Sequence, residues 1–234
     1  MTQTTLKPIV QLKDACKTYS QGDTQVHAVD HLTLEIQQGD FAALSGPSGS
    51  GKTSVLNLIG GLDTPTSGEV WVNNINLAAL SRRELSQLRK NHIGFVFQSY
   101  NLIPVLTAYE NAEFVLELQG TRRSEYHDKV MSVLKDVGLE GLEHRRPDEM
   151  SGGQQQRVAI ARAIVTEPAI VLADEPTANV DSHTAESLLD LMQMLNHEKG
   201  ITFLFSTHDQ HVMNRTRRLI HLLDGKIEYD ELKP

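Results

Sequence analysis

The stretch FAALSGPSGSGKTSVLNLIGG, residues 41–61, decides the fold. It contains a short apolar strand, a glycine-rich loop and an apolar helix, and the loop matches the pattern G-x-x-x-x-G-K-[ST]. Glycines let successive backbone amides turn toward one point, and the N-terminus of the following helix adds a partial positive charge. The stretch therefore predicts a phosphate-binding loop at a strand end. A glycine-rich structural turn is the alternative.

The side chains of this loop are those that a nucleoside triphosphate requires. Lys52 can bridge the β- and γ-phosphates, and the hydroxyl of Thr53 can ligate a magnesium ion. The predicted nucleotide-binding residues of the loop are Gly46, Pro47, Ser48, Gly49, Ser50, Gly51, Lys52, Thr53 and Ser54.

Composition narrows the class of protein. A chain of 234 residues with 39% hydrophobic residues can form one large domain, or a domain with a subdomain. Its 22 basic and 30 acidic residues argue against a protein that coats nucleic acid. A single cysteine, Cys16, allows no intrachain disulfide, which fits a reducing compartment. The apolar runs are far shorter than a membrane span, so we expect a chain that cannot cross a bilayer by itself.

Short apolar segments predict a buried parallel sheet, because each is too short for a helix and apolar on both faces. They are FAAL (41–44), IGFVF (93–97), AIVLA (169–173) and ITFLF (201–205). Between the last two, Leu188, Leu191 and Leu195 recur at helical spacing after the sequence DSHT. This pattern predicts an amphipathic crossover helix and an α/β fold.

Other patterns predict structure around this sheet. The alternating segments VQL (10–12) and LTLEI (32–36) indicate antiparallel strands, and LIHLLDGKIEYD (219–230) indicates a hairpin that turns at Asp224 and Gly225. Residues 99–165 show no strand pattern and include a helical segment. We therefore expect an inserted helical subdomain there.

Two carboxylates follow the segment AIVLA. Asp174 and Glu175 would lie at the carboxyl edge of the parallel sheet, where ligands bind. Asp174 would hold magnesium through water, and Glu175 could polarise the attacking water as a general base. The alternative is an acidic strand end that caps the next turn, since Pro176 follows at once.

Gln98 and His208 follow two other predicted strands and fall at the same edge. A neutral amide can ligate magnesium and position water, and an imidazole can donate to a γ-phosphate oxygen. Their alternative role is that of ordinary turn residues. The predicted catalytic residues are Lys52, Gln98, Glu175 and His208, and the predicted magnesium ligands are Thr53, Gln98 and Asp174.

The sequence SGGQQQR, residues 151–157, predicts a second anion site at a helix N-terminus. Ser151 can cap the helix, while Gly152 and Gly153 leave their amides bare at its positive end. The predicted contact residues are Ser151, Gly152, Gly153 and Gln154.

These motifs occur in one order along nearly the whole chain: GPSGSGKT, Gln98, SGGQ, LADE, NVD (179–181) and His208. In this order they resemble the ATP-binding subunits of ABC transporters. The resemblance implies that two subunits pack head to tail, so that the signature SGGQ of one covers the γ-phosphate held by the other. It also implies that Tyr19 stacks on adenine and that Asp181 lies next to the second ATP site of the dimer. A core tyrosine and a plain helix cap are the respective alternatives.

The resemblance implies a fold class as well: α/β, with a P-loop NTPase (RecA-like) core, an N-terminal antiparallel β subdomain and an inserted α-helical subdomain. We expect one domain over residues 1–234. In it, 1–98 and 166–234 form the nucleotide-binding core with the β subdomain, and 99–165 form the helical signature subdomain. Three places depart from the usual motifs, namely Met150, the pair Thr53-Ser54 and Val180, but none of these changes removes a catalytic atom.

The branch that the sequence resembles is that of lipoprotein-release and macrolide or peptide exporters and their cell-division relatives. This implies ATP and Mg²⁺ as ligands, ATP hydrolysis, a homodimer in the ATP-bound state, an integral membrane permease as partner and no nucleic acid. It places the chain in the cytoplasm, peripheral to the inner face of the cell membrane. The segment 99–111 would dock the permease, or pack in the core, or both.

Other functions remain as alternatives. One is the ATPase of a cell-division-type membrane complex, in which ATP can act as a clamp. A soluble ABC ATPase of repair or translation would carry a long coiled coil or a second cassette, and neither is seen. A P-loop kinase would leave the sequence SGGQQQR without a role.

Overall fold

The central element is a six-stranded sheet with strand order β10-β9-β3-β8-β7-β6. The computed structural model describes residues 8–22 and 24–233. The strands are β3 (Phe41–Ser45), β6 (Ile93–Phe97), β7 (Ile170–Asp174), β8 (Phe203–Ser206), β9 (Arg218–Leu223) and β10 (Lys226–Leu232). All neighbours pair in parallel except β9 and β10. The predicted parallel strands and C-terminal hairpin are confirmed, and both turn residues, Asp224 and Gly225, have positive φ.

A second, antiparallel sheet has the order β2-β1-β4-β5. Its strands are β1 (Pro8–Gln21), β2 (Thr24–Gln37), β4 (Ser67–Val72) and β5 (Ile75–Asn76). The sequence patterns predict β1 and β2 but not β4 or β5. In β4 only Val70 and Val72 are buried, which is too short an alternation to be recognised by itself.

Helix α1 (Lys52–Ile59) lies between the two sheets. Its buried residues Val55, Leu56 and Ile59 belong to a core cluster that includes Leu12 of β1 and Leu44 of β3. The opposite face of the central sheet forms another cluster, which contains Phe41. Because both faces of β3 are buried, its sequence is continuously apolar instead of alternating.

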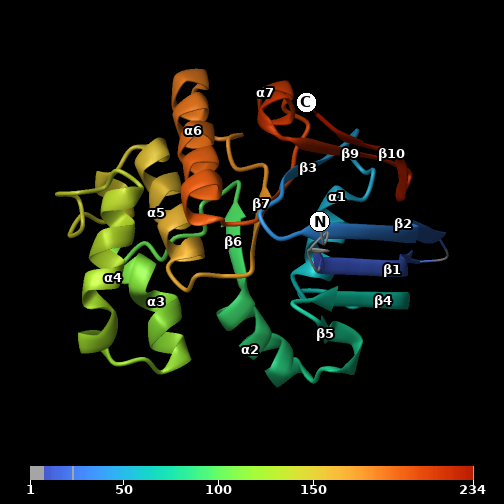
Figure 1. Ribbon diagram of the computed structural model, residues 1–234, viewed down its shortest axis with the longest axis horizontal. Helices are drawn as coiled ribbons and strands as arrows, with labels where there is room; N and C mark the ends of the chain where they lie inside the picture. Colours follow the sequence, from blue (N-terminus) through green and yellow to red (C-terminus); the bar gives the residue numbers. More distant parts are fainter. Residues whose placement is uncertain (1–7, 23, 234) are drawn as a thin grey trace, which may run out of the picture.

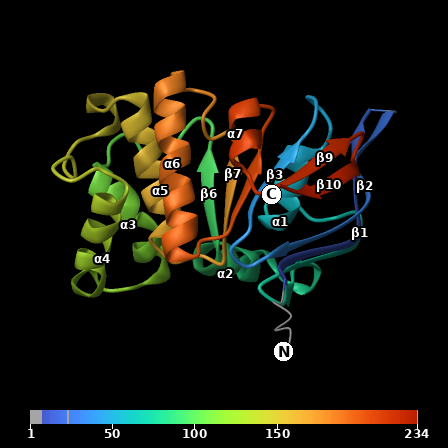
Figure 2. The same ribbon diagram turned by 45° about the horizontal axis from the view of Figure 1, so that its top comes forward.

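The remaining helices are α2 (Arg82–His92), α3 (Ala108–Gln119), α4 (Arg123–Asp136), α5 (Gly152–Ile164), α6 (Ser182–Lys199) and α7 (Gln210–Arg215), with 3₁₀ turns at Leu77–Ala79 and Pro147–Glu149. Figures 1 and 2 show α3 to α6 on one side of the molecule and the antiparallel sheet on the other, with β6 and β7 between them. The predicted crossover helix is α6. Helices α3 to α6 cover the Phe41 face of the central sheet.

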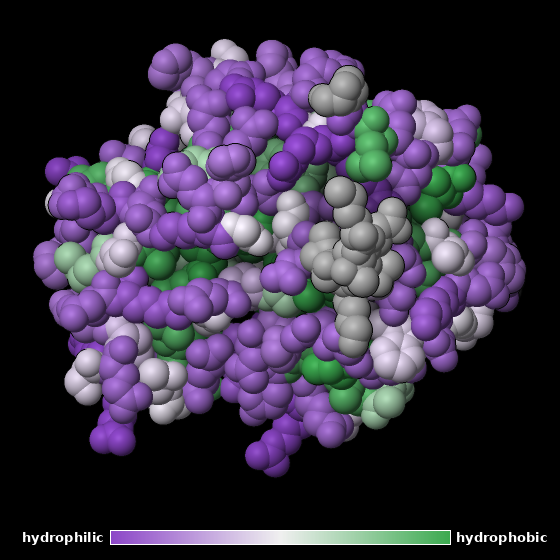
Figure 3. Space-filling model, in the orientation of Figure 1, coloured by the Kyte–Doolittle hydropathy of each residue, from purple (hydrophilic) through white to green (hydrophobic). Residues whose placement is uncertain are grey.

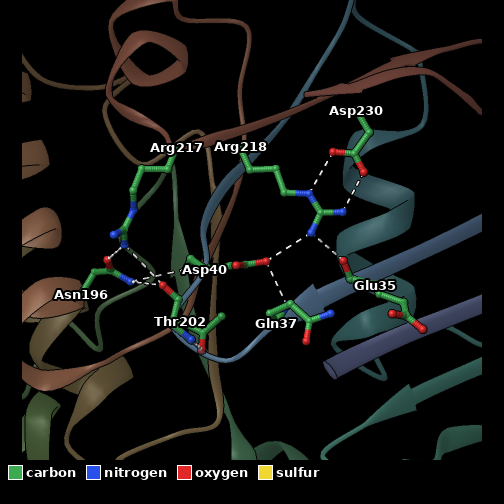
Figure 4. A network of polar contacts seen from close by, with 9 residues as sticks. Glu35, Gln37, Asp40, Asn196, Thr202, Arg217, Arg218 and Asp230 are labelled. Carbon is green, nitrogen blue, oxygen red and sulfur yellow. Dashed lines mark hydrogen bonds and ion pairs between the residues drawn. The ribbon is translucent and has the colours of Figure 1, made fainter. Parts of the chain in front are cut away.

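A polar network ties the turn between β2 and β3 to the C-terminal strands (Figure 4). Arg218 of β9 donates to Asp230 of β10 at 2.9 and 2.7 Å and to Asp40 of the turn at 3.2 Å. Asn196 of α6 donates to the carbonyl of Gly39 in the same turn at 3.0 Å. These contacts hold the amino edge of the sheet, opposite the predicted site.

Hydrophilic residues cover most of the face seen in Figure 3, and hydrophobic ones form separate patches. Among the described helices, none combines the length and the apolar character that crossing a bilayer would require.

Candidate nucleotide-binding site

The predicted catalytic side chains meet at the carboxyl edge of the central sheet. Strand register places Phe97 beside Asp174 and Asp174 beside Ser206, so the residues that follow these strands are neighbours. A cavity of about 770 Å³ lies at this edge. Its lining includes Tyr19, Pro47, Ser48, Gly49, Gly51, Lys52, Thr53, Ser54, Gln98, Asp174, Glu175, Ser206 and His208.

Two glycines of the loop are required because neighbouring backbone lies too close to leave room for a side chain. Gly46 has φ +137°, and a Cβ atom there would lie 2.1 Å from the carbonyl oxygen of Leu222. Gly51 has φ +102°, and a Cβ atom there would lie 2.2 Å from the carbonyl oxygen of Ala28. Any other residue would push the loop away from β9 and β2. The sequence pattern predicted glycine for phosphate contact, and the structure adds this packing reason.

Lys52 folds back over the loop. Its Nζ atom donates to the carbonyls of Gly46 at 2.8 Å and Pro47 at 2.9 Å. Burial lowers the pKa of Lys52 below its ordinary value, and the charges of Glu175 and Asp174 oppose this shift. An ammonium group held over a glycine-rich loop at a helix N-terminus can bind a phosphate group.

Thr53 and Asp174 face each other across the cavity. The Thr53 hydroxyl lies 3.5 Å from both carboxylate oxygens of Asp174, at the long limit of a hydrogen bond. Burial raises the pKa of Asp174, and the nearby charge of Glu175 acts in the same direction. Hydroxyl, carboxylate and the amide oxygen of Gln98 are hard oxygen donors of the kind that Mg²⁺ prefers, so the residues present fit this ion.

Glu175 is held by two neighbours. His208 Nδ1 lies 2.6 Å from one carboxylate oxygen, and the Thr207 hydroxyl donates to the other at 3.2 Å. Glu175 also has φ +46°, an unfavourable backbone conformation for a residue with a side chain and one that occurs often at functional sites. Sequence reasoning missed Thr207, although its position after β8 is the same signal that identified His208.

Gln98 contacts a residue from a distant loop. Its side-chain amide donates to Asn179 Oδ1 at 3.4 Å, and Asn179 Nδ2 donates to the Gln98 carbonyl at 3.0 Å. The Tyr100 hydroxyl donates to the Asn179 carbonyl at 3.0 Å. The pairing was not predicted, since nothing in the sequence relates residues 81 positions apart.

The SGGQ segment begins α5 as predicted. Ser151 caps the helix, because its hydroxyl accepts from the Gln154 amide at 3.3 Å and its own amide donates to Gln154 Oε1 at 2.9 Å. A Cβ atom on Gly152 would lie 2.8 Å from the Tyr100 hydroxyl, and one on Gly153 would lie 2.4 Å from Thr184. Both glycines therefore also serve close packing.

The structure does not bring every predicted site residue to one cavity. Of the described residues, those lining the cavity include neither 151–154 nor Asp181. Asp181 caps α6, with Oδ1 accepting from the Thr184 amide at 3.0 Å, which confirms the helix-cap reading. Within the loop itself, Gly46 and Ser50 are not among the lining residues, and Ser50 is 2% exposed.

Another group of ligand-type atoms lies outside this site. Those of Cys16, Asp30 and His31 are all within 4.8 Å of one another. Asp30 is paired with Lys226 at 3.1 Å, and His31 with Asp14 at 2.8 Å. Two of the three groups are thus engaged in surface ion pairs. The cluster was not predicted, because Cys16 lies on β1 whereas Asp30 and His31 lie on β2.

Comparison with known proteins identifies the class. Residues 29–178 match the family model described as ABC transporter. This match covers more than half of the chain, and the arrangement of loop, carboxylates and signature helix agrees with it. The chain belongs to the ABC transporter family, and it is an ATPase of that family.

Individual relatives are similar over nearly the whole chain. The ABC transporter ATP-binding protein MJ0796 of Methanocaldococcus jannaschii is 44% identical over 227 residues, covering 95% of this chain and 97% of the relative. A dimeric structure of MJ0796 in a post-hydrolysis state, bound to ADP and Pi, superposes with a TM-score of 0.87 and covers 96% of this chain and 99% of that one.

Two other relatives point to a branch. The lipoprotein-releasing system ATP-binding protein LolD 1 of Chlorobium chlorochromatii is 45% identical over 203 residues, covering 86% of this chain and 82% of the relative. The macrolide export ATP-binding/permease protein MacB of Hyphomonas neptunium is 43% identical over 223 residues, covering 95% of this chain. The chain spans 34% of the length of MacB.

Proposed function

We propose that this chain binds and hydrolyses MgATP at the cavity on the carboxyl edge of the sheet and thereby drives a separate membrane permease. The observation that carries the proposal is the convergence of the phosphate loop with Asp174, Glu175, Gln98 and His208 on one cavity. ATP hydrolysis needs a group that binds phosphate, a general base and a residue that positions the attacking water, all at one site.

The loop and Tyr19 bind the nucleotide. The backbone amides of the loop and Lys52 hold the phosphates, while the Tyr19 ring, 38% exposed at the cavity wall, stacks on adenine. Thr53, Asp174 and Gln98 would hold the magnesium ion, which when bound neutralises charge on the β- and γ-phosphate oxygens.

Glu175 acts as the general base. It takes a proton from the water that attacks the γ-phosphorus. The bond between the γ-phosphorus and the β,γ-bridging oxygen then breaks, and ADP leaves with that oxygen. His208 and Thr207 fix the carboxylate for this step through the hydrogen bonds described above. Gln98, held by Asn179, positions the water.

The active unit is a homodimer that closes on ATP. Ser151 to Gln154 lie away from the cavity of their own chain, and Ser151 is exposed at a helix N-terminus. Placed head to tail, residues 151–154 of one copy cover the γ-phosphate in the other, and Asp181 lies beside the sister site. The dimeric structures of MJ0796 support this arrangement. In this scheme residues 99–165 act as the helical subdomain that carries the signature, while 1–98 and 166–234 form the core.

A groove of about 330 Å³ is the surface that we assign to the permease. Phe95, Phe114 and Leu118 contribute apolar surface, and Arg89 and Arg162 add positive charge. The groove includes Asn101, just after the Gln98 loop, so an occupant would lie close to the catalytic edge. Its apolar and basic lining fits a short helix with apolar residues and an acidic rim, presented on the cytoplasmic side of an integral membrane protein.

The similarity to LolD and MacB supports a permease of the lipoprotein-release or macrolide-export type, and a location on the inner face of the cell membrane. A cell-division-type membrane complex is the alternative within the same class. Identification of the membrane protein that copurifies with the chain separates the two.

Replacement of the base tests the proposed chemistry. Glu175→Gln should reduce ATP turnover by about 10²-fold or more, because the amide cannot accept the proton, while ATP binding persists. The same variant should elute as a dimer in ATP and as a monomer without it. Wild-type turnover in Glu175→Gln would overturn the assignment of the base. A Glu175→Gln variant that is inactive but never dimerises would support Glu175 as the general base and contradict the proposed ATP-dependent dimer.

A further inference from the structure

Lys17, Tyr19 and Asp63 form one compact group next to the cavity. Tyr19 Oη donates to Asp63 Oδ2 at 2.8 Å, and Lys17 Nζ donates to Asp63 Oδ1 at 2.6 Å. Lys17 Nζ also lies 5.0 Å from the centroid of the Tyr19 ring. A single carboxylate thus holds both the ring hydroxyl and the cation beside the ring.

The Tyr19 ring lies at the cavity wall, whereas the charged groups of Lys17 and Asp63 lie outside the cavity lining. Tyr19 lines the cavity, whereas neither Lys17 nor Asp63 is among the described residues that do. The side chains of Lys17 and Asp63 are 13% and 28% exposed. Their ion pair is therefore partly shielded from water, and such a pair keeps its geometry better than an exposed one.

Asp63 is anchored independently of Tyr19. Its Oδ1 atom accepts from the amide of Thr64 at 2.7 Å. Partial burial raises the pKa of Asp63, but hydrogen bonds from Lys17, Tyr19 and Thr64 outweigh it and hold the pKa below its ordinary value. The carboxylate is therefore ionised at neutral pH.

The same carboxylate is linked to the phosphate loop. Asp63 follows α1, and its amide donates to the carbonyl of Asn57 in that helix at 3.2 Å. Helix α1 begins with Lys52 and Thr53, which line the cavity. One helix thus carries phosphate ligands at its start and, beyond its end, the residue that orients Tyr19.

We propose that Asp63, with Lys17, is a positioning residue that holds the Tyr19 ring in place to stack on the base of ATP. The inference rests on the proposed role of Tyr19. A ring fixed before binding loses less side-chain freedom when the base arrives, so affinity rises without a new contact to the ligand. The Lys17 ammonium group lies over the ring and adds a cation–π interaction that holds it.

A comparison of ATP with a ligand that lacks the adenine base separates this role from a general effect on folding. Asp63→Ala should weaken ATP binding about fivefold, the loss expected for one hydrogen bond, and leave kcat within about twofold. The affinity for inorganic tripolyphosphate, which has no base, should not change. Asp63→Asn keeps an acceptor for the Tyr19 hydroxyl and should recover part of the loss.

A double-mutant cycle completes the test. In a Tyr19→Ala background, Asp63→Ala should have no further effect on ATP affinity, because Asp63 acts through the ring. The matched control is Asp30→Ala, which also removes a lysine-paired carboxylate but lies away from the cavity.

The outcomes are distinguishable. Tyr19→Ala without any loss of ATP affinity would overturn the proposed role of Tyr19 and this inference with it. A loss in Tyr19→Ala but none in Asp63→Ala would leave the proposed function standing and overturn the inference. Equal losses for ATP and tripolyphosphate in Asp63→Ala would also overturn it, since the effect would not depend on the base.

Discussion

His208 Nδ1 lies 2.6 Å from Glu175 Oε1, so the second residue after β8 is in direct contact with the first residue after β7. Because this contact and the one from Thr207 are both made by side chains of the same chain, the protein itself orients the proposed general base. His208 is 73% exposed at its side chain, whereas Glu175 is 17% exposed. The histidine is therefore placed to meet an incoming phosphate while the carboxylate stays partly shielded.

His208→Ala should lower kcat by about 10²-fold and leave ATP affinity nearly unchanged, because it removes the hydrogen-bond partner of Glu175 and, in the proposed mechanism, a donor to the γ-phosphate. Steady-state turnover and equilibrium ATP binding measure the two effects. His211→Ala is the matched control, since His211 also pairs with a carboxylate, Glu186, but outside the cavity. Equal turnover in the two variants would contradict the role of His208.

Lys52→Ala should weaken ATP binding itself by about tenfold or more, because a charge-assisted contact to phosphate is lost. Calorimetric titration with ATP measures the change. Lys226→Ala removes an exposed lysine on β10 and should bind as the wild type does. Unaltered ATP affinity in Lys52→Ala would show that the ammonium group does not hold phosphate.

Leu118→Glu should release the chain from membranes without affecting ATP affinity. Leu118 is 52% exposed in the groove, so a glutamate there can be solvated in the free chain but would place a charge against an apolar docking helix. Sedimentation of the chain with membranes from the native host is the measurement. Val26→Glu, at a 46% exposed position on β2, is the control. Retention of Leu118→Glu on membranes would count against the groove.

Met150→Leu should change neither stability nor turnover to any large extent. Met150 is 7% exposed and belongs to the core cluster on the Phe41 side of the sheet. Exchanges between methionine and leucine keep volume and usually cost less than about 1.5 kcal/mol. Urea unfolding and the dependence of ATPase rate on ATP concentration test this. A marked change in cooperativity would show that residue 150 affects the signature helix.

Glu113→Gln should flatten the dependence of stability on pH. Burial raises the pKa of Glu113 above its value in the unfolded chain, against the opposing effect of Arg123. For a carboxyl with a raised folded pKa, its contribution is fully present below the unfolded pKa and is lost as pH rises through the folded pKa. Wild type should therefore lose stability relative to Glu113→Gln between acid and neutral pH.

Urea unfolding at several pH values measures this difference. Parallel curves for wild type and Glu113→Gln would argue against a raised pKa at Glu113.

The sequence by itself determined the elements that local patterns encode. The loop of residues 46–53, the apolar strands and the capped helices follow from glycine conformation, apolar periodicity and capping residues, which act over a few positions. The same rules placed Gln98, Glu175 and His208 at one edge, since parallel strands end together. They missed β4 and β5, where few apolar positions repeat.

Only the tertiary structure decided which of these residues touch. Strand order and register bring Glu175 to His208, and loop packing brings Gln98 to Asn179 and Tyr19 to Asp63. These pairs are separated by tens of residues, so no periodic pattern relates their partners. Their contacts follow from strand register and from the packing of the loops at the sheet edge, and both depend on the whole core.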